Sequence, residues 1–329
     1  MLGLCSCGSG GLRSLPLNNL DSSVSVLYSI DSTNQRILRY TPNDVGTATL
    51  VSSINLPAGL TATLVATDAG GDLYIGGYIG NANHSEVLIY DATATDSDTP
   101  LRILPLQPGK LTALAVDRQG AIYVAQYYVA QNIAAQQNNV AAINIYSGNI
   151  GQDAPIRTID PSLVELNDLA VDSAGNVYVS GSNGNASSIR EFAPTASGTA
   201  AAIRTLWAAN GSAFGGIAVD DSGNIFAMQG LTLSKFAAGA TGTKQPLQAI
   251  NLPAKFSTYS KEGLPNVLRR DGLGNFFVPV TMTGENQSLN MVYGFAANAA
   301  GDDTPMLQFI ALEATASAPH GANIPLAVF

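Results

Sequence analysis

The stretch DLAVDSAGNVYVS, residues Asp168–Ser180, decides the fold, because four close copies of it recur along the chain. The copies begin at Leu64, Ala113, Gly216 and Val267, and their shared aspartates lie 48 to 55 residues apart. Each copy joins two apolar segments through a D-x-x-G turn, which is the composition of a buried antiparallel hairpin. The aspartate can accept hydrogen bonds from backbone amides two residues on, and the glycine supplies the positive φ that the turn needs.

The period and the rest of each unit indicate a β-propeller, whose blades repeat about every 40–50 residues with four strands each. A third strand ends in an aromatic residue, as in VLIYDA from Val87. A fourth strand begins near a proline, as in PLRILPL from Pro100, and proline suits a strand edge. Polar side chains on this fourth strand should discourage edge-to-edge association; they are Arg102, Arg157, Arg204, Gln248 and Gln308.

The two ends of the repeated region are complementary. Val24–Ile30 is similar to the second strand of a unit but has no first strand before it, and Asn323–Phe329 is similar to a first strand with nothing after it. We therefore predict an all-β fold, a six-bladed β-propeller of four-stranded antiparallel blades. The C-terminal strand pairs with the N-terminal blade and closes the ring, which removes exposed sheet edges. Residues 21–329 form this single domain, and residues 1–20 form a flexible tail.

The amino-acid composition limits the classes of partner and the cellular location that we expect. The chain is 46% hydrophobic and only 12% charged, against about 25% charged residues in typical soluble proteins. This composition favours a secreted or cell-envelope protein, which we expect to be a monomer. The net charge of −9 excludes nucleic acid as a partner, because a polyanion requires a basic surface. No apolar run reaches the roughly 18–20 residues of a membrane helix, so membrane association is expected only through a lipid anchor.

A lipidation site is predicted at Cys7. The segment Leu4-Cys5-Ser6-Cys7 resembles the cleavage box of bacterial lipoproteins, although only three residues precede it, where a charged and an apolar region normally stand. The alternative is that Cys5 and Cys7 are two unpaired cysteines in the tail.

One face of the predicted ring is a candidate binding surface. The D-x-x-G turns lie on the opposite face, whereas the loops between second and third strands and between blades lie on this one and vary in length. We call it the variable face. Long loops on a rigid scaffold often carry binding sites, and tyrosine combines flat apolar area with a polar tip. The predicted ligand-binding residues are Tyr78, Tyr127, Tyr128, Phe256 and Tyr259, and the alternative is that they only pack loops onto the ring.

A second candidate site lies at the mouth of the central channel. Asn167, with Asp168 next to it, and Asn266 stand where the innermost strands enter the channel, and a carboxylate with amides there can hold a calcium ion. The alternative is that they cap backbone groups. Arg269 and Arg270 replace the Ala-Val of other units, and a charge there must be paired or reach water. They could form an ion pair between blades or a site for an anion.

Little in the sequence supports other catalytic chemistry. The chain has two histidines, His84 and His320, too few for a histidine-rich zinc site, and no G-x-S-x-G motif. The repeated aspartates are explained by their turns. The sequence therefore predicts no catalytic residue, no metal ligand and no cofactor, with calcium at the channel mouth as the open alternative.

The repeat AVDSAGNVYV, followed by a strand ending in Tyr/Phe-Ala-Pro and a segment such as ASGTAAAIRTL, resembles the NHL-type repeats of bacterial secreted and cell-surface propellers. The resemblance covers Val24 to Phe329. It implies a propeller that binds a glycan, peptide or envelope protein. Related six-bladed propellers include metal-dependent lactonases and lyases, and only Asn167, Asp168 and Asn266 match their metal sites loosely. We therefore expect a non-enzymatic binding protein first, a metal-dependent channel enzyme second, and a structural subunit of an extracellular assembly third.

Overall fold

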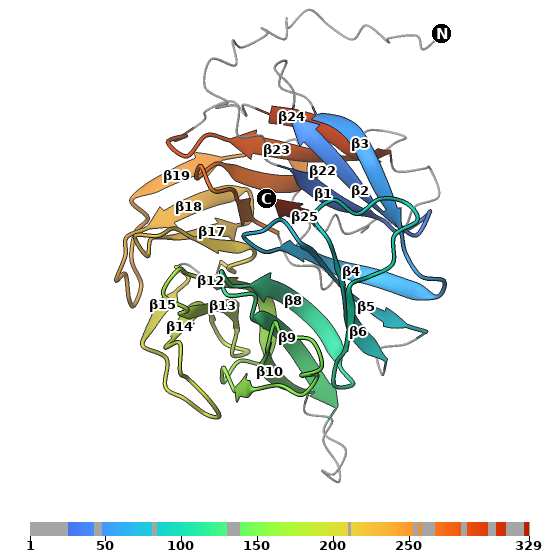
Figure 1. The fold of residues 1–329 in the computed structure, drawn as a ribbon. Coiled ribbons are helices and arrows are strands. Elements are labelled where there is room, and N and C mark those ends of the chain that lie inside the picture. The colour runs from blue at the N-terminus through green and yellow to red at the C-terminus, as the bar shows by residue number, and fades with distance from the viewer. Residues whose placement is uncertain are drawn as a thin grey trace, which may run out of the picture.

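The computed structural model describes residues 26–42, 48–80, 84–129, 139–209, 212–252, 256–257, 267–283, 288–301, 307–313 and 326–328. These residues form six antiparallel blades around a central axis (Figure 1), so the predicted all-β, six-bladed propeller is confirmed. The described part of the chain has no helix of the length and hydrophobicity that crossing a membrane requires.

Within each blade the strands follow one another outward from the axis. Blades 1 to 3 contain, in this order, β25 (Leu326–Val328), β1 (Leu27–Asp31), β2 (Arg36–Pro42) and β3 (Ala48–Asn55); β4 (Leu60–Thr67), β5 (Leu73–Ile79), β6 (Ser85–Tyr90) and β7 (Arg102–Pro105); and β8 (Lys110–Val116), β9 (Ile122–Val129), β10 (Asn139–Tyr146) and β11 (Arg157–Ile159).

Blades 4 and 5 repeat this order, and blade 6 adds one short strand. They contain β12 (Glu165–Val171), β13 (Val177–Ser182), β14 (Ser187–Phe192) and β15 (Arg204–Trp207); β16 (Ile217–Val219), β17 (Ile225–Gln229), β18 (Thr232–Phe236) and β19 (Gln248–Asn251); and β20 (Phe256–Ser257), β21 (Arg269–Arg270), β22 (Phe276–Thr283), β23 (Ser288–Phe295) and β24 (Leu307–Glu313). Both β20 and β21 pair with β22. Phe256 therefore lies in a short strand, where the sequence predicted a loop from Ala254 to Leu264.

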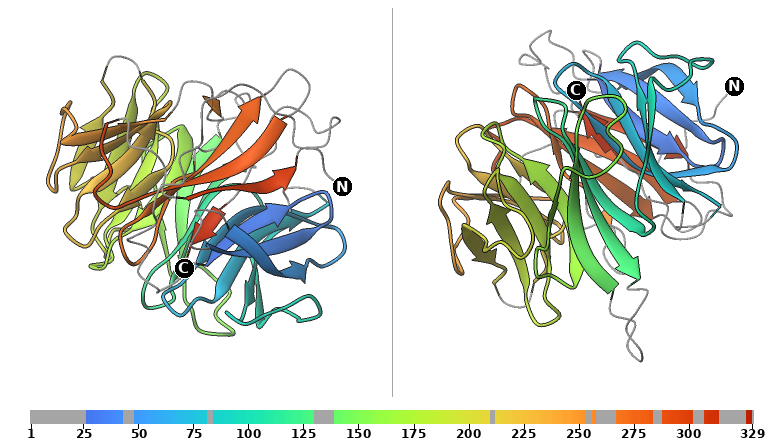
Figure 2. Two further views of the ribbon diagram at one scale, coloured as in Figure 1. Left: turned by 90° about the horizontal axis from the view of Figure 1, so that it is seen from above. Right: turned by 60° about the horizontal axis from the view of Figure 1, so that its bottom comes forward.

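The ring closes as predicted, because β25 pairs with β1 and places Val328 opposite Leu27. Figure 2 shows this C-terminal strand beside the N-terminal strands of blade 1. The sequence expected the second strand of this blade at Val24–Ile30, and the structure has it at Leu27–Asp31.

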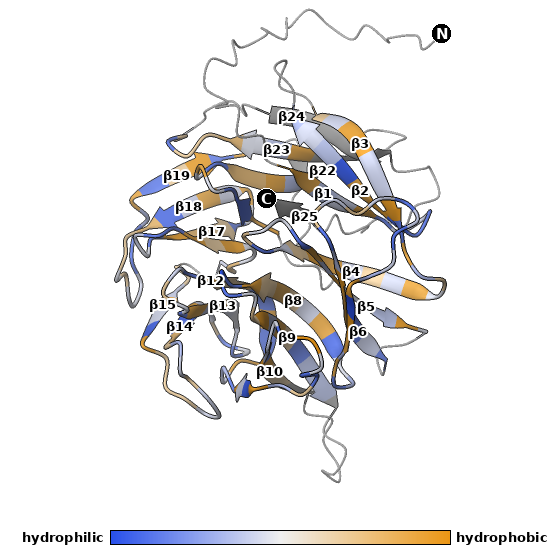
Figure 3. Ribbon diagram, viewed as in Figure 1, coloured by the Kyte–Doolittle hydropathy of each residue, from blue (hydrophilic) through white to orange (hydrophobic). Residues whose placement is uncertain are grey.

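The hydrophobic core lies between the blades. Each cluster of buried apolar side chains joins two neighbouring blades, as where Phe226 of β17 meets Phe276 of β22 with ring centroids 4.4 Å apart. Figure 3 shows the apolar character along strands such as β8, β17 and β22, with hydrophilic residues in many of the loops at the rim. Blade packing therefore supplies the burial that one four-stranded sheet could not supply alone.

The D-x-x-G turns have the predicted chemistry. In blade 4 the Asp172 carboxylate accepts hydrogen bonds from the backbone amides of Ala174 and Asn176, both at 2.9 Å. It also accepts one from the Asn176 side chain at 2.8 Å and one from the Tyr178 hydroxyl at 3.1 Å. Gly175 has a φ of 84°, which is the left-handed conformation that favours glycine. The aspartate therefore holds the turn together.

Asp172→Ala is expected to lower the free energy of unfolding by about 2 kcal/mol, because four donors lose a charged acceptor and water replaces only some of these bonds. Urea denaturation of the variant and the wild type would measure the loss. Asp221→Ala is a suitable control, because Asp221 is the second residue of the corresponding turn of blade 5 and makes one exposed ion pair, to Arg118. Equal losses in the two variants would contradict the proposed role of the turn aspartate.

Neighbouring blades are also joined at their outer strands, by two repeated devices. The loop between the third and fourth strands crosses to the preceding blade and forms a parallel bridge with its outermost strand; the bridges are Ile54–Asp96, Ile159–Gly198, Leu206–Gly242 and Ile250–Gly301. In blades 4, 5 and 6 a glycine with positive φ makes this bridge, with φ of 61° at Gly198. We call these bridges the clasps.

The second device uses polar side chains of the fourth strand. Arg102 of β7 donates to the carbonyls of Ser147 and Gln152 in blade 3, both at 2.9 Å. Arg157 donates to Ala196 of blade 4 at 2.9 Å, and Gln248 donates to Ala299 of blade 6. The sequence predicted that these residues keep strand edges apart. In the structure Arg102, Arg157 and Gln248 donate hydrogen bonds to the next blade, so these side chains join neighbouring blades.

Candidate functional site

The six innermost strands meet around the axis, and four of the residues predicted at the channel mouth lie on two of them: Asn167 and Asp168 on β12, and Arg269 and Arg270 on β21. Asn167 of blade 4 and Thr112, which stands at the equivalent position of blade 3, are each the extra residue of a β-bulge. Thr112 donates a hydrogen bond to the carbonyl of Ala125 at 3.2 Å, and Asn167 donates one to that of Phe214 at 2.8 Å. Because a bulge leaves backbone groups outside the strand ladder, these contacts agree with the capping interpretation.

Asp168 is a buried carboxylate that joins three blades. It is 2% exposed and lies on β12 of blade 4. Its oxygens accept hydrogen bonds from the backbone amides of Leu169 at 2.9 Å and of Ile217 in blade 5 at 3.0 Å. Arg269 of blade 6 forms an ion pair with it at 3.1 Å. Burial raises the pKa of the Asp168 carboxyl, and the positive charge of Arg269 acts in the opposite direction.

A serine completes this contact between blades 4 and 5. The hydroxyl of Ser180, on β13, donates to the carbonyl of Gly215 at 2.7 Å and accepts a hydrogen bond from the amide of Asp168 at 3.0 Å. Ser180 was not predicted as a site residue. It stands where other units have Gly, Ala, Met or Pro, and this difference is the signal that could have identified it.

The two consecutive arginines do not converge on one ligand. Successive side chains of a strand point to opposite faces, and Arg269 reaches Asp168, whereas the guanidinium of Arg270 lies against Gly274 of its own turn. Of the two predicted alternatives, an ion pair between blades or an anion site, Arg269 therefore forms the ion pair.

The described channel residues do not fit a calcium ion. Calcium takes six to eight oxygen ligands, several of them carboxylates. Asp168 already faces a guanidinium and two backbone amides, and the amide nitrogen of Asn167 points to a carbonyl. Among the described residues no group of three or more histidines, cysteines, aspartates and glutamates could hold a metal ion. Asn266, the third predicted channel residue, lies outside the described part of the chain.

The two tyrosines of blade 3, Tyr127 and Tyr128, are hydrogen-bonded to neighbouring strands of the ring. The hydroxyl of Tyr127 accepts a hydrogen bond from the amide of Leu166 in blade 4, and burial raises the pKa of Tyr127 to about 12. Tyr128 is hydrogen-bonded to Asn144 on the adjacent strand. Both side chains are half-buried. These contacts agree with the alternative that the two tyrosines pack the blade, and a role in ligand binding stays a prediction.

The other predicted residues of the variable face are spread around it. Tyr78 lies half-buried near the end of β5, next to Ile79, which is 44% exposed. Phe256 pairs with Met282 in the backbone ladder of blade 6. Tyr259, like the predicted lipidation residue Cys7, lies outside the described residues. The described members of this set lie on three blades, Tyr78 on blade 2, Tyr127 and Tyr128 on blade 3 and Phe256 on blade 6.

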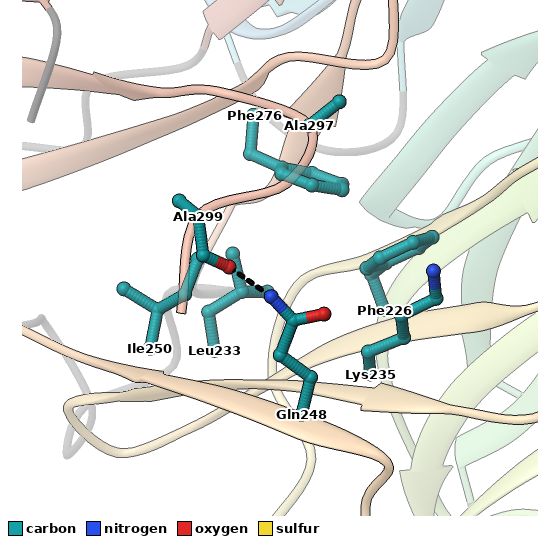
Figure 4. A pocket seen from close by; sticks show the side chains of 8 residues that line it. All are labelled: Phe226, Leu233, Lys235, Gln248, Ile250, Phe276, Ala297 and Ala299. Carbon is teal, nitrogen blue, oxygen red and sulfur yellow. Dashed lines mark hydrogen bonds between the residues drawn. The ribbon is translucent and has the colours of Figure 1, made fainter. Parts of the chain in front are cut away.

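A small cavity lies between blades 5 and 6, and Figure 4 shows its lining. Its volume is about 10 Å³, which is at the lower limit for one water molecule. The amide nitrogen of Gln248 points across it to the carbonyl of Ala299, and Lys235 lies over the ring of Phe226 at 5.2 Å. This cavity is a packing seam between blades and has no room for a ligand.

The fold has known counterparts, although no protein-family model matches the chain and no curated protein matches it in sequence. A protein of unknown function from Bacteroides caccae is 12% identical, with a TM-score of 0.58 over 93% of this chain and 99% of that one. The PQQ-bound aldose sugar dehydrogenase from Streptomyces coelicolor is 13% identical, with a TM-score of 0.50 over 77% and 84%. A gluconolactonase from Xanthomonas campestris is 17% identical, with a TM-score of 0.49 over 77% and 78%. At these identities the similarity shows the six-bladed propeller fold alone.

Proposed function

We propose that this protein is a non-enzymatic propeller of the cell surface or the extracellular space, which binds a glycan, peptide or protein partner through its variable face. The observation that carries the proposal is the ion pair between Asp168 and Arg269. A channel enzyme of the lactonase type needs a carboxylate that is free to hold a metal ion or a proton in transit. Here the described channel carboxylate is neutralised by an arginine and fully hydrogen-bonded.

Loops of varied length and exposed apolar side chains support binding on the variable face. On the opposite face the turns between first and second strands are short D-x-x-G motifs whose aspartates accept bonds within their own turns. In four blades the longer loops of that face, between third and fourth strands, are tied to the preceding blade by the clasps. The variable face carries exposed apolar side chains at the ends of strands, among them Ile79 and Val164, which are 44% and 54% exposed. Exposed apolar side chains on a rigid frame are suitable contacts for a partner.

The proposal also covers the type of repeat, the lipid anchor, the kind of partner and the aromatic contacts. The repeats are of the NHL type, Cys7 carries the lipid anchor, and the partner is a component of the cell envelope. The aromatic residues of the predicted set contribute contacts to the partner; they are Tyr78, Tyr127, Tyr128, Phe256 and Tyr259. No cofactor is required for binding.

The proposal predicts that partner binding depends on the variable face and not on the opposite one. Ile79→Ser and Val164→Ser together are expected to weaken binding at least tenfold, because two apolar contacts are lost. Leu273→Ser is the matched control, since Leu273 is 46% exposed on a turn of the opposite face. Binding to a glycan array and to purified envelope proteins, by surface plasmon resonance, would measure the effect.

Two outcomes would contradict the proposal. In the first, binding is lost equally in the Leu273→Ser control, which would place the partner elsewhere. In the second, the protein hydrolyses a lactone, loses this activity when calcium is chelated, and loses it in Asp168→Ala, which would establish the channel enzyme instead.

A further inference from the structure

A cleft of about 260 Å³ lies on the outer side of the ring, between blades 4 and 5. It is distinct from the channel. It opens onto the variable face, because the connection into blade 5 and the loop between β17 and β18 belong to that face, while the fourth strand of blade 4 and the loop between β18 and β19 supply the rest of its lining. The lining residues that matter are Trp207, Ser212, Gln229, Thr232, Lys244 and Gln245. Its volume is slightly below the roughly 300–1,000 Å³ of sites for drug-sized ligands, so it suits a small ligand.

The aromatic wall of this cleft is fixed by the ring itself. Trp207 ends β15, and its backbone amide donates to the carbonyl of Gly242 at 2.9 Å in the clasp between the two blades. Phe214 and Phe236, which also line the cleft, meet edge to face with centroids 5.9 Å apart. The indole of Trp207 is half-buried, so one part of it packs on the protein and another faces the cleft.

Five polar side chains contribute to the remaining lining, and two of them, Lys244 and Gln245, have no partner among the described residues. The side chain of Gln229 donates to the hydroxyl of Ser212 at 2.9 Å, which fixes both groups at the cleft. Within the part of the chain that the structure describes, the Trp207 indole N–H, the Lys244 ammonium and the Gln245 amide have no hydrogen-bond or ion-pair partner. These groups are available donors, together with the amide oxygen of Gln245 as an acceptor.

The charge of the cleft is opposite to that of the chain. The protein has a net charge of −9, yet Lys244 is the charged residue among those that line the cleft. A ligand with a carboxylate would gain a charge-assisted hydrogen bond from this ammonium. Its hydroxyl groups would meet the amides and the hydroxyls of the wall, and its C–H face would pack on the indole.

We propose that this cleft binds a sugar ring that carries a carboxylate, of the hexuronic acid class. A flat amphipathic aromatic side chain beside fixed amide and hydroxyl groups matches the alternating apolar and polar faces of a pyranose. Lys244 selects the acidic sugar over the neutral one. This inference rests on the proposed function, because the cleft opens onto the variable face, and it names one ligand class for one part of that face.

The sequence offers a direct probe, because Trp207 is the only tryptophan of the chain. Titration of the whole protein with galacturonic and glucuronic acid, and with their disaccharides, is expected to change the tryptophan emission in a saturable way. Glucose and galactose are expected to bind about tenfold more weakly, since they lack the charge-assisted bond. Lys244→Gln should remove this difference, whereas Lys235→Gln, in the same blade but at the seam with blade 6, should preserve it.

Calorimetry of Trp207→Ala provides a second readout, in which acidic sugar binding is lost while the melting temperature shows that the ring is intact. Emission that changes only linearly with sugar concentration, or no change with any of these sugars, would overturn the proposal. So would full affinity for acidic sugars in Lys244→Gln. Because Ile79→Ser and Val164→Ser leave the cleft untouched, the two binding proposals can fail separately.

Discussion

Replacing Arg269 with glutamine is expected to lower the free energy of unfolding by about 3–5 kcal/mol at neutral pH, the usual cost of removing one partner of a buried ion pair. The Asp168 carboxylate is 2% exposed, and in the variant it would face only the amides of Leu169 and Ile217. The loss should spread over blades 4, 5 and 6, because this carboxylate touches all three. Urea denaturation at constant ionic strength would measure it.

The same variant should show a characteristic dependence on pH. Burial raises the pKa of Asp168 in the folded state, and without Arg269 nothing of opposite charge counteracts it. Below the pKa of the unfolded chain, near 3.9, both states hold the proton and the buried group is neutral. As the pH rises towards the folded-state pKa, the unfolded chain releases its proton first, so stability falls with rising pH. The penalty of Arg269→Gln should therefore be small at about pH 4 and should grow as the pH rises.

Arg118→Gln is the control for this experiment. Arg118 pairs with Asp221 at 2.8 Å across two blades, as Arg269 does with Asp168, but both side chains are more than half exposed. An exposed pair of this kind is worth at most about 1 kcal/mol. A penalty for Arg269→Gln that is equally small, or that does not change with pH, would mean that the Asp168 carboxylate is well solvated.

Arg204→Met is expected to produce the second large loss, about 3 kcal/mol, because it leaves a buried glutamate without its cation. Arg204 and Glu191 are 12% and 10% exposed and form an ion pair between adjacent strands of blade 4. The guanidinium also donates to the carbonyl of Gly223 in blade 5 at 3.2 Å and lies over the ring of Tyr178 at 5.7 Å. Methionine can replace the stem of the side chain but none of these contacts.

Arg157→Met is the matched comparison for Arg204→Met. Arg157 occupies the same position in blade 3, but the structure gives it a neutral acceptor, the carbonyl of Ala196. Loss of that bond should cost about 1 kcal/mol. Thermal or urea unfolding of both variants would test the order, and equal losses would show that the buried charge of Glu191 contributes nothing beyond a neutral contact.

The repeat at Asp168–Ser180 was sufficient to predict the fold, because the residues that stabilise each turn lie within five positions of one another. Asp172, Gly175 and Asn176 form their hydrogen bonds with one another, so a local sequence pattern identifies them. The closure by β25 also followed from the repeat, since its two halves are recognisable at the two ends of the chain.

The candidate sites were less predictable, because they depend on residues far apart in sequence. Asp168 and Arg269 were each identified from sequence, but their pairing across 101 positions requires blades 4 and 6 to be placed around one axis. Arg102 and Arg157 donate to backbone carbonyl groups. Every residue has such a group, so the sequence does not show which carbonyl accepts the bond. Nothing in the repeat singles out Trp207 except its rarity, because the cleft that it lines forms only when two blades meet.

The clasps have a consequence for how such a ring can change its size. Blades 4 and 5 each contribute a crossing loop to the blade before and receive one on the outer strand from the blade after, as Gly198 and Gly242 show on either side of blade 4. A duplicated repeat of this kind would therefore bring with it both a crossing loop and an outer strand that can receive one. The number of blades in an ancestral ring could then grow or shrink in whole units, by recombination between repeats, with every new junction already complementary.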